Sequence, residues 1–217
     1  MEIKSRYQLQ KTLSKDMAWR RHELTEIKLS VKAVQGQGRS TFTPVRAALT
    51  LLYAHWEGVV KNSALFYLEF VRGQGFSCHQ VAPHFLALAI KKRLSDESQK
   101  ARRTEAYIRV ADFFLTGLQA RLEIDVEGAI DTESNLNSDV LRNSITQLGL
   151  DYAPFETKEL LINKELLGHR NPISHGEYRM VDAMTYLELH DAVIQLLVEF
   201  QNQIIDAASN ETHLRPS

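Results

Sequence analysis

The sequence predicts an all-α protein folded as a helical bundle. Apolar residues recur at steps of three, four and seven along most of the 217 residues, as on helices that bury one face. The segments with this spacing are long and are joined by short loops, which is the pattern of a bundle. Apolar and acidic residues alternate only briefly around Ile124 and Val126, so any β-structure is expected within residues 123–130.

Two long helices are expected in the N-terminal part of the chain. The first covers residues 5–34, which carry one continuous apolar stripe. A loop with two glycines follows over residues 35–43. Thr43 and Pro44 then offer an N-cap and a first-turn proline for a second helix that ends at Gly73. This second helix is apolar on most sides, which predicts a central position in the bundle.

Shorter helices are expected in the middle of the chain, before an irregular connector. The apolar spacing places them at residues 78–94 and 99–122. Residues 123–137 are polar and rich in turn-forming side chains, and we interpret them as the connector.

Three further helices are expected after the connector. One starts at Ser138 or Asp139 and ends at Gly149, which is typical of a helix C-terminus. Thr157 and Asp182 are the predicted N-caps of the other two, because each side chain can accept a hydrogen bond from the first turn.

Composition limits the class of protein. The formal net charge is −1, so the chain lacks the strongly basic balance of a simple nucleic-acid binder. Cys78 is the only cysteine, which excludes an intramolecular disulfide and a cysteine-based zinc site. A single cysteine, and no run of about 20 apolar residues, predict a cytoplasmic protein without a membrane segment. No change in composition divides the chain, so we expect one domain over residues 1–208 and a frayed tail at residues 209–217.

The segment Arg170-Asn171-Pro172-Ile173-Ser174-His175 is the strongest candidate for chemistry. A guanidinium can hold a phosphoryl group with two hydrogen bonds and stabilise the charge of its transition state. An imidazole can act as general acid or base near neutral pH, and the Asn171 amide can donate a further hydrogen bond to phosphate. The structural alternative is a helix end in which Asn171 caps, Pro172 opens a turn and Gly176 closes it.

Other chemistries lack their motifs. The sequence contains no Walker loop, no dinucleotide-binding glycine pattern, no zincin motif and no Gly-x-Ser-x-Gly. His79 and His84 have no acidic neighbours in the sequence, so we expect no metal site and no cofactor.

Helix geometry limits how Arg170 and His175 could act together. Five residues on a straight α-helix turn through roughly 500°, which leaves the two side chains about 140° apart. Either Pro172 takes Asn171 out of the helical region and bends the backbone, or a second copy of the chain completes the site. We expect both to contribute.

Three residues are candidates for a supporting role at this segment: Arg46, Glu57 and Ser174. The Glu57 carboxylate lies on the most apolar helix and needs a partner there. Arg46 is eleven residues earlier, about three turns away on the same face. The pair either supports the motif or forms a structural ion pair. Trp56 is expected in the core.

Basic residues are densest in the middle of the chain. They are Lys91, Lys92, Arg93, Lys100, Arg102, Arg103 and Arg109. Such a cluster is either an approach surface for RNA or a solvated helix face. His169 and His190 are expected to be surface or hydrogen-bonded histidines without a catalytic role.

The candidate segment, written as Leu-Leu-x-x-Arg-Asn-x-Ile-Ser-His-Gly, resembles the Arg-x(4–6)-His motif of the HEPN superfamily. Four further stretches resemble a cyanobacterial toxin-type HEPN subfamily: residues 45–49, 52–58, 134–138 and 148–151. One branch of the superfamily has a tyrosine two residues after the histidine, which a partner nucleotidyltransferase modifies. Here Tyr178 lies three residues after His175 and departs from that pattern.

The resemblance implies a bundle of four main helices that forms a homodimer with both motifs facing one cleft. It also implies metal-independent RNA cleavage that leaves a 2′,3′-cyclic phosphate. In this chain Arg170 would stabilise the transition state, Asn171 would position the phosphate, and His175 would act as acid or base. The implied role is the toxin or effector of a toxin–antitoxin or defence system, restrained by an antitoxin protein. The alternative is a non-catalytic HEPN module for interaction or dimerisation.

Overall fold

The computed structural model describes residues 2–35, 42–98 and 103–216. Within these ranges the chain forms helices and no strands, which confirms the predicted all-α class. The predicted loop at residues 35–43 and the start of the predicted helix at 99–122 fall largely outside the described residues. No described helix has the length and apolar character that crossing a membrane requires.

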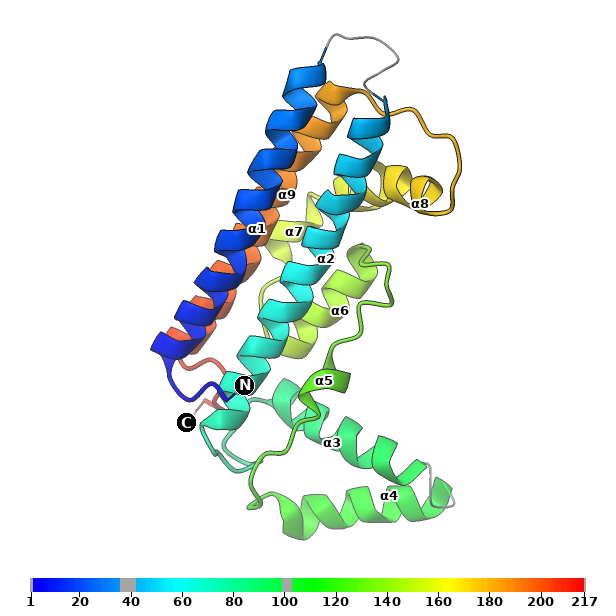
Figure 1. Cartoon of the computed structure of the whole chain (residues 1–217). Coiled ribbons are helices and arrows are strands. Elements are labelled where there is room, and N and C mark those ends of the chain that lie inside the picture. Colours follow the sequence, from blue (N-terminus) through cyan, green and yellow to red (C-terminus); the bar gives the residue numbers. More distant parts are fainter. Residues whose placement is uncertain (1, 36–41, 99–102, 217) are drawn as a thin grey trace.

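Three long helices lie side by side and form the body of the molecule (Figure 1). They are α1 (Arg6–Val34), α2 (Phe42–Gly73) and α9 (Ala183–Ser209). The predicted N-cap of α9 is confirmed, because the Asp182 side chain accepts a hydrogen bond from the Thr185 N–H. The predicted N-cap of α2 is wrong, since this helix already includes Phe42 and Thr43 lies inside it.

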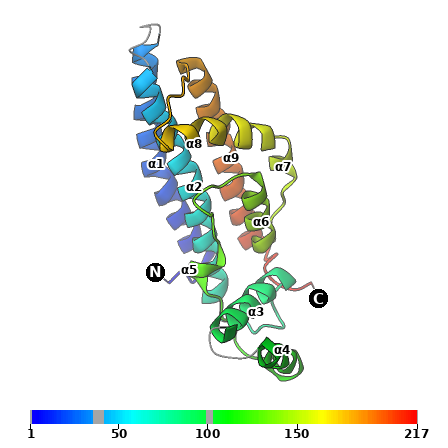
Figure 2. The ribbon, with the colours of Figure 1, turned by 90° about the vertical axis from the view of Figure 1, so that its right-hand side faces the viewer.

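Shorter helices pack on α2, which confirms its predicted central position (Figures 1 and 2). They are α6 (Ser138–Leu148), the π-helix η3 (Leu161–Leu167) and α8 (Gly168–Ser174). The predicted bounds of α6 are confirmed, and Gly149 ends it in the left-handed conformation at φ 67°. Thr157 does not start a helix; it is the residue after α7 (Ala153–Glu156).

A helical arm projects from the end of the bundle remote from α8 (Figures 1 and 2). It consists of α3 (Pro83–Ser98), α4 (Arg103–Asp112) and the π-helix η2 (Phe113–Gly117). The predicted helix at 78–94 begins five residues late, because the backbone N–H groups of Cys78 and His79 instead donate to the carbonyls of Ala120 and Leu118.

The connector and the C-terminal segment differ from prediction in detail. The connector contains one short helix, α5 (Val126–Ala129), and the isolated β-bridges lie outside residues 123–130. One bridge joins Val81 to Leu214 in the segment predicted to be a frayed tail. There His213 is buried at 3% exposure and its carbonyl accepts from the Ala82 N–H, so the tail is packed instead.

Candidate functional site

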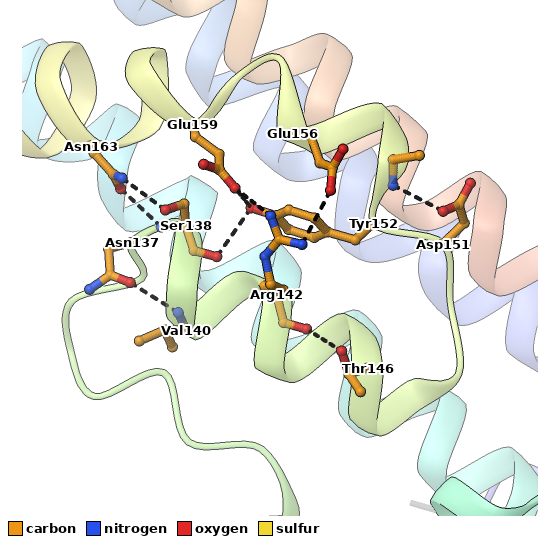
Figure 3. Close-up of polar contacts among 11 residues, drawn as sticks. Asn137, Ser138, Val140, Arg142, Thr146, Asp151, Tyr152, Glu156, Glu159 and Asn163 are labelled. Atoms are coloured by element: carbon orange, nitrogen blue, oxygen red, sulfur yellow. Dashed lines mark hydrogen bonds and ion pairs between the residues drawn. The ribbon is translucent and has the colours of Figure 1, made fainter.

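A polar cluster fixes the start of η3 against α6 (Figure 3). The Asn163 side chain of η3 accepts from the Ser138 N–H at 2.9 Å and donates to Ser138 Oγ at 2.8 Å. Arg142 of α6 pairs with Glu156 and Glu159 at 3.2 and 2.7 Å. These contacts hold both ends of the turn that leads into η3, and η3 continues directly into α8.

The motif segment lies on α8. This helix runs through Pro172 to Ser174, and Asn171 remains helical, so the prediction that Pro172 takes its neighbour out of the helix is wrong. His175 follows as the C-cap residue, and Gly176 closes the helix at φ 80°. A π-helix immediately before a short α-helix is a feature often found at functional sites, because the wider turn re-aims the side chains that follow.

Arg170 is held in a fixed pose. Its guanidinium Cζ lies 4.0 Å from the centroid of the Tyr53 ring on α2. One guanidinium nitrogen, Nη1, donates to Asn171 Oδ1 at 3.0 Å. The Nε of Arg170 is buried and has no hydrogen-bond partner among the described residues. A buried donor without a partner is rare in folded proteins. The rest of the half-buried Arg170 side chain keeps part of its surface exposed.

The connector reaches the same place through Asn135. The Asn171 Nδ2 donates to Asn135 Oδ1 at 3.2 Å. The next residue, Leu136, is fixed on α2, because its N–H donates to Tyr53 Oη at 2.7 Å and its carbonyl accepts from Trp56 Nε1 at 3.2 Å. Trp56 is fully buried, which confirms that it belongs to the core. Asn171 therefore does not cap a helix; its side chain joins the motif to the connector.

Tyr53 stays protonated in this environment. Burial raises its pKa to about 12, and the nearby Glu57 carboxylate also acts in that direction. The Leu136 N–H and the positive charge of Arg170 oppose this shift. Glu57 thus lies beside the ring that supports Arg170, and its negative charge is close enough to affect the Tyr53 hydroxyl.

Arg46 contacts the chain just after the motif and does not pair with Glu57. Its Nη2 donates to the Glu177 carbonyl at 2.8 Å, and its Cζ lies 5.9 Å from the Tyr178 ring centroid. Across the described residues no ion pair joins Arg46 to Glu57, so the predicted structural pair is wrong. Arg46 instead holds the chain that follows Gly176.

His175 and Ser174 are exposed at the end of α8. Within the part of the chain that the structure describes, the His175 imidazole has no hydrogen-bond partner. One chain therefore brings Arg170 and Asn171 together with Tyr53 and Asn135. It leaves His175 and Ser174 outside this set of contacts.

The predicted RNA-approach residues lie on the arm, remote from α8 (Figure 1). Three of them have partners in the chain. Lys91 Nζ donates to the Ala129 carbonyl at 3.3 Å, Lys92 Nζ lies 3.4 Å from a Glu123 carboxylate oxygen, and Arg93 covers the Phe113 ring. Arg102 lies outside the described residues, and Arg103 is part of α4.

His169 and His190, expected to have no catalytic role, make contacts within the chain. His169 Nδ1 accepts from Arg179 Nε at 3.2 Å. His190 is buried at 6% exposure, with Nδ1 2.9 Å from Asp191 Oδ1. In the described ranges no group of three or more His, Cys, Asp or Glu side chains is placed to bind a metal.

The all-helical fold and the Arg-x4-His segment on a late helix are the features to compare with known proteins. A family model described as MAE_28990-like HEPN matches residues 9–213, nearly the whole chain. The chain therefore belongs to the HEPN superfamily, as its motif predicts. Neither the curated proteins nor the solved structures include a significant match.

Sequence reasoning assigned no role to Tyr53 or Asn135. A signal for Tyr53 was present, because Arg46, Tyr53 and Glu57 are spaced by seven and four residues and so share one face of α2. Asn135 lies in an irregular segment, where no periodicity indicates which way a side chain points.

Proposed function

We propose that the chain is a metal-independent endoribonuclease, acting in the cytoplasm as the toxin or effector of a toxin–antitoxin or defence system. The pose of Arg170 carries this proposal. Its guanidinium is supported by the Tyr53 ring and the Asn171 side chain, while the buried Nε has no partner among the described residues. A preorganised, half-buried guanidinium suits a scissile phosphate, because it stabilises developing charge without rearranging.

The proposed reaction is a transesterification within the RNA backbone. The ribose 2′-hydroxyl loses its proton and attacks the neighbouring phosphorus, and the bond from phosphorus to the 5′ oxygen breaks. The 5′ oxygen gains a proton, which leaves a 2′,3′-cyclic phosphate and a 5′-hydroxyl. Arg170 stabilises the charge on phosphorus, Asn171 positions the phosphate, and His175 serves as acid or base.

A homodimer would complete this site. Arg170 is half-buried against α2, whereas His175 is exposed beyond the end of α8. Within one chain a straight α8 directs the Arg170 and His175 side chains to different sides of the helix. The exposed imidazole of a second copy can instead approach the Arg170 of the first. We therefore propose a composite site between two α8 helices, with Ser174 at its edge.

The alternative function is a non-catalytic HEPN module. It is favoured by the lysines and arginine of α3, which are engaged within the chain instead of lining a groove beside Arg170. Expression in a heterologous host distinguishes the two. An active toxin, unless restrained by its antitoxin, should be poorly tolerated as wild type and tolerated as His175→Ala, whereas a module should be tolerated in both forms.

The direct test is RNA cleavage by the purified chain in the presence of EDTA. Wild type should cut, and His175→Ala should lose about 10²–10⁴-fold in rate, because a general acid–base group contributes that much. His169→Ala is the matched control and should cut normally with the same helical content. Wild-type activity in His175→Ala would contradict the proposal.

A further inference from the structure

The outer side of the arm carries a large apolar surface that nothing in the described chain covers. Four large side chains of α4 and η2 are exposed: Tyr107 at 60%, Ile108 at 62%, Phe114 at 46% and Leu115 at 82%. Ala111 is exposed between them. Single apolar residues on a surface are ordinary, whereas a contiguous set of this size marks an interaction site.

The opposite side of the same helix is already packed. Phe113 is buried, and the Arg93 guanidinium of α3 lies over its ring with Cζ 4.4 Å from the centroid. Leu118 packs against the core at the base of the arm. A helix that is apolar on two opposite sides is typically buried on both. Because α4 is the outermost helix of the arm in both views (Figures 1 and 2), the second cover is expected from another molecule.

The exposed residues are spaced symmetrically about Ala111. Tyr107 and Ile108 precede it by four and three residues, and Phe114 and Leu115 follow it by three and four. A second copy related by a two-fold axis at Ala111 would run antiparallel. It would then place Tyr107 opposite Leu115 and Ile108 opposite Phe114, with the small Ala111 side chains where the helices cross.

The exposed area also fits a second copy. At their exposed fractions, large side chains of these types offer roughly 500 Å² of apolar surface per copy. A stable interface buries about 800 Å² on each partner, so this set would form more than half of one. Glu105, Arg109 and Asp112 are exposed beside it and would form a polar rim.

We propose that Tyr107, Ile108, Ala111, Phe114 and Leu115 form an isologous interface through which two copies of this chain pair by their arms. The interface is independent of the proposed ribonuclease site, because the arm and α8 lie at different ends of the bundle (Figure 1). Pairing by the arms would join two single chains, or two of the dimers proposed to form between α8 helices. It would not cover the α8 helices.

Sedimentation of the full chain over a series of concentrations tests the interface. Leu115→Glu should weaken arm pairing by about 10-fold or more, because it places a charge in an apolar contact. Leu29→Glu is the matched control: Leu29 is 60% exposed on α1, and the substitution should leave the association unchanged. If two copies also pair through the proposed site of Arg170 and His175, the Leu115→Glu variant should still form that dimer and cut RNA. Association through the arm and cleavage of RNA are thus separate readouts, so failure of one proposal is distinguishable from failure of the other.

Cross-linking tests the two-fold axis itself. Ala111→Cys should form an intermolecular disulfide under mild oxidation, since two-fold symmetry brings the two introduced thiols together. Gln119→Cys, at an exposed position just after η2 and outside the apolar set, should not, and the native Cys78 is buried. Equal masses for wild type and Leu115→Glu at every concentration, or equal cross-linking of the two cysteine variants, would overturn the proposal. The proposal would also be overturned if the apolar set bound RNA bases instead of a second copy. In that case Leu115→Glu would lose RNA binding without any change in the mass of the protein in solution.

Discussion

The α8 site and the arm use positive charge in opposite ways. At α8 a single half-buried guanidinium is supported by an aromatic ring, two asparagines and a fixed connector. On the arm several cations lie close together in the sequence. Three of them contact groups of the same chain: Lys91 a backbone carbonyl, Lys92 a carboxylate and Arg93 an aromatic ring. Basic residues clustered in a sequence therefore indicate a charged protein surface. A single cation held by several neighbouring side chains instead indicates a candidate functional site. Variants of the two regions should separate these roles.

The largest effect is expected from Arg170→Lys. An ammonium keeps the charge but cannot make planar two-point contact with phosphate or retain the same stacking on Tyr53. Removing one preorganised donor at a transition state typically costs about 10²–10³-fold, so kcat for RNA cleavage should fall by that order. The free energy of unfolding should change little. A variant that cuts at the wild-type rate would show that Arg170 is only structural.

The aromatic support of Arg170 can be tested at Tyr53 with two substitutions. Tyr53→Leu removes the ring face, and a cation–π contact worth about 0.5–2 kcal/mol predicts a loss of about 2- to 30-fold in kcat/KM. Tyr53→Phe keeps the ring and loses the hydroxyl that accepts from Leu136, so it should cost stability while keeping most activity. Thermal unfolding and steady-state kinetics on both variants separate the two contributions. Equal activity in the two variants would exclude a role for the ring.

A smaller effect is expected on the arm. We propose that Lys91 and Lys92 guide the RNA backbone by exchanging their contacts within the chain for phosphate oxygens. Lys91→Ala/Lys92→Ala should then weaken RNA binding a few-fold. The slope of log affinity against log salt should then fall by about 2, because each phosphate contact contributes roughly one. Filter binding at several salt concentrations measures this. The kcat should stay unchanged, and a fall in kcat instead would place these lysines in the chemistry.

The smallest effect concerns pH and stability. Burial lowers the pKa of His84 and of His213 below the usual value of 6.5, and the nearby His213 lowers the pKa of His84 further. Because the folded state favours the neutral rings, their contribution is present above pH 6.5 and is lost as the pH falls. The melting temperature should therefore drop by a few degrees between pH 7 and pH 5, and His84→Gln should reduce this drop. His175→Ala, at an exposed position, should leave it unchanged.

Features set by neighbouring residues could be predicted from the sequence. The bounds of α6 and the N-cap of α9 follow from Gly149 and Asp182, whose effects extend over a single turn. The position of the motif on a late helix was equally accessible, because Arg170 and His175 lie in one short segment. These predictions needed no knowledge of how distant elements meet.

Features set by long-range contacts could not be predicted from the sequence. The stacking of Arg170 on Tyr53 and the bond from Asn171 to Asn135 join residues far apart in the chain. The π-helical turn of η3 is also absent from the pattern, since its leucines fit a 3.6-residue period equally well. The packing of the C-terminal segment depends on His213, and no local signal distinguishes a buried histidine from an exposed one.

The central claim is that Arg170 and His175 cleave RNA through the ribose 2′-hydroxyl. The most direct measurement is to map one cleavage position in a labelled RNA and to replace only that nucleotide by its 2′-deoxy form. We expect the wild-type chain to leave a 2′,3′-cyclic phosphate on the unmodified RNA in EDTA and to leave the substituted position uncut. Cleavage of the deoxy position at a comparable rate would contradict the claim, because the attacking group would then come from elsewhere.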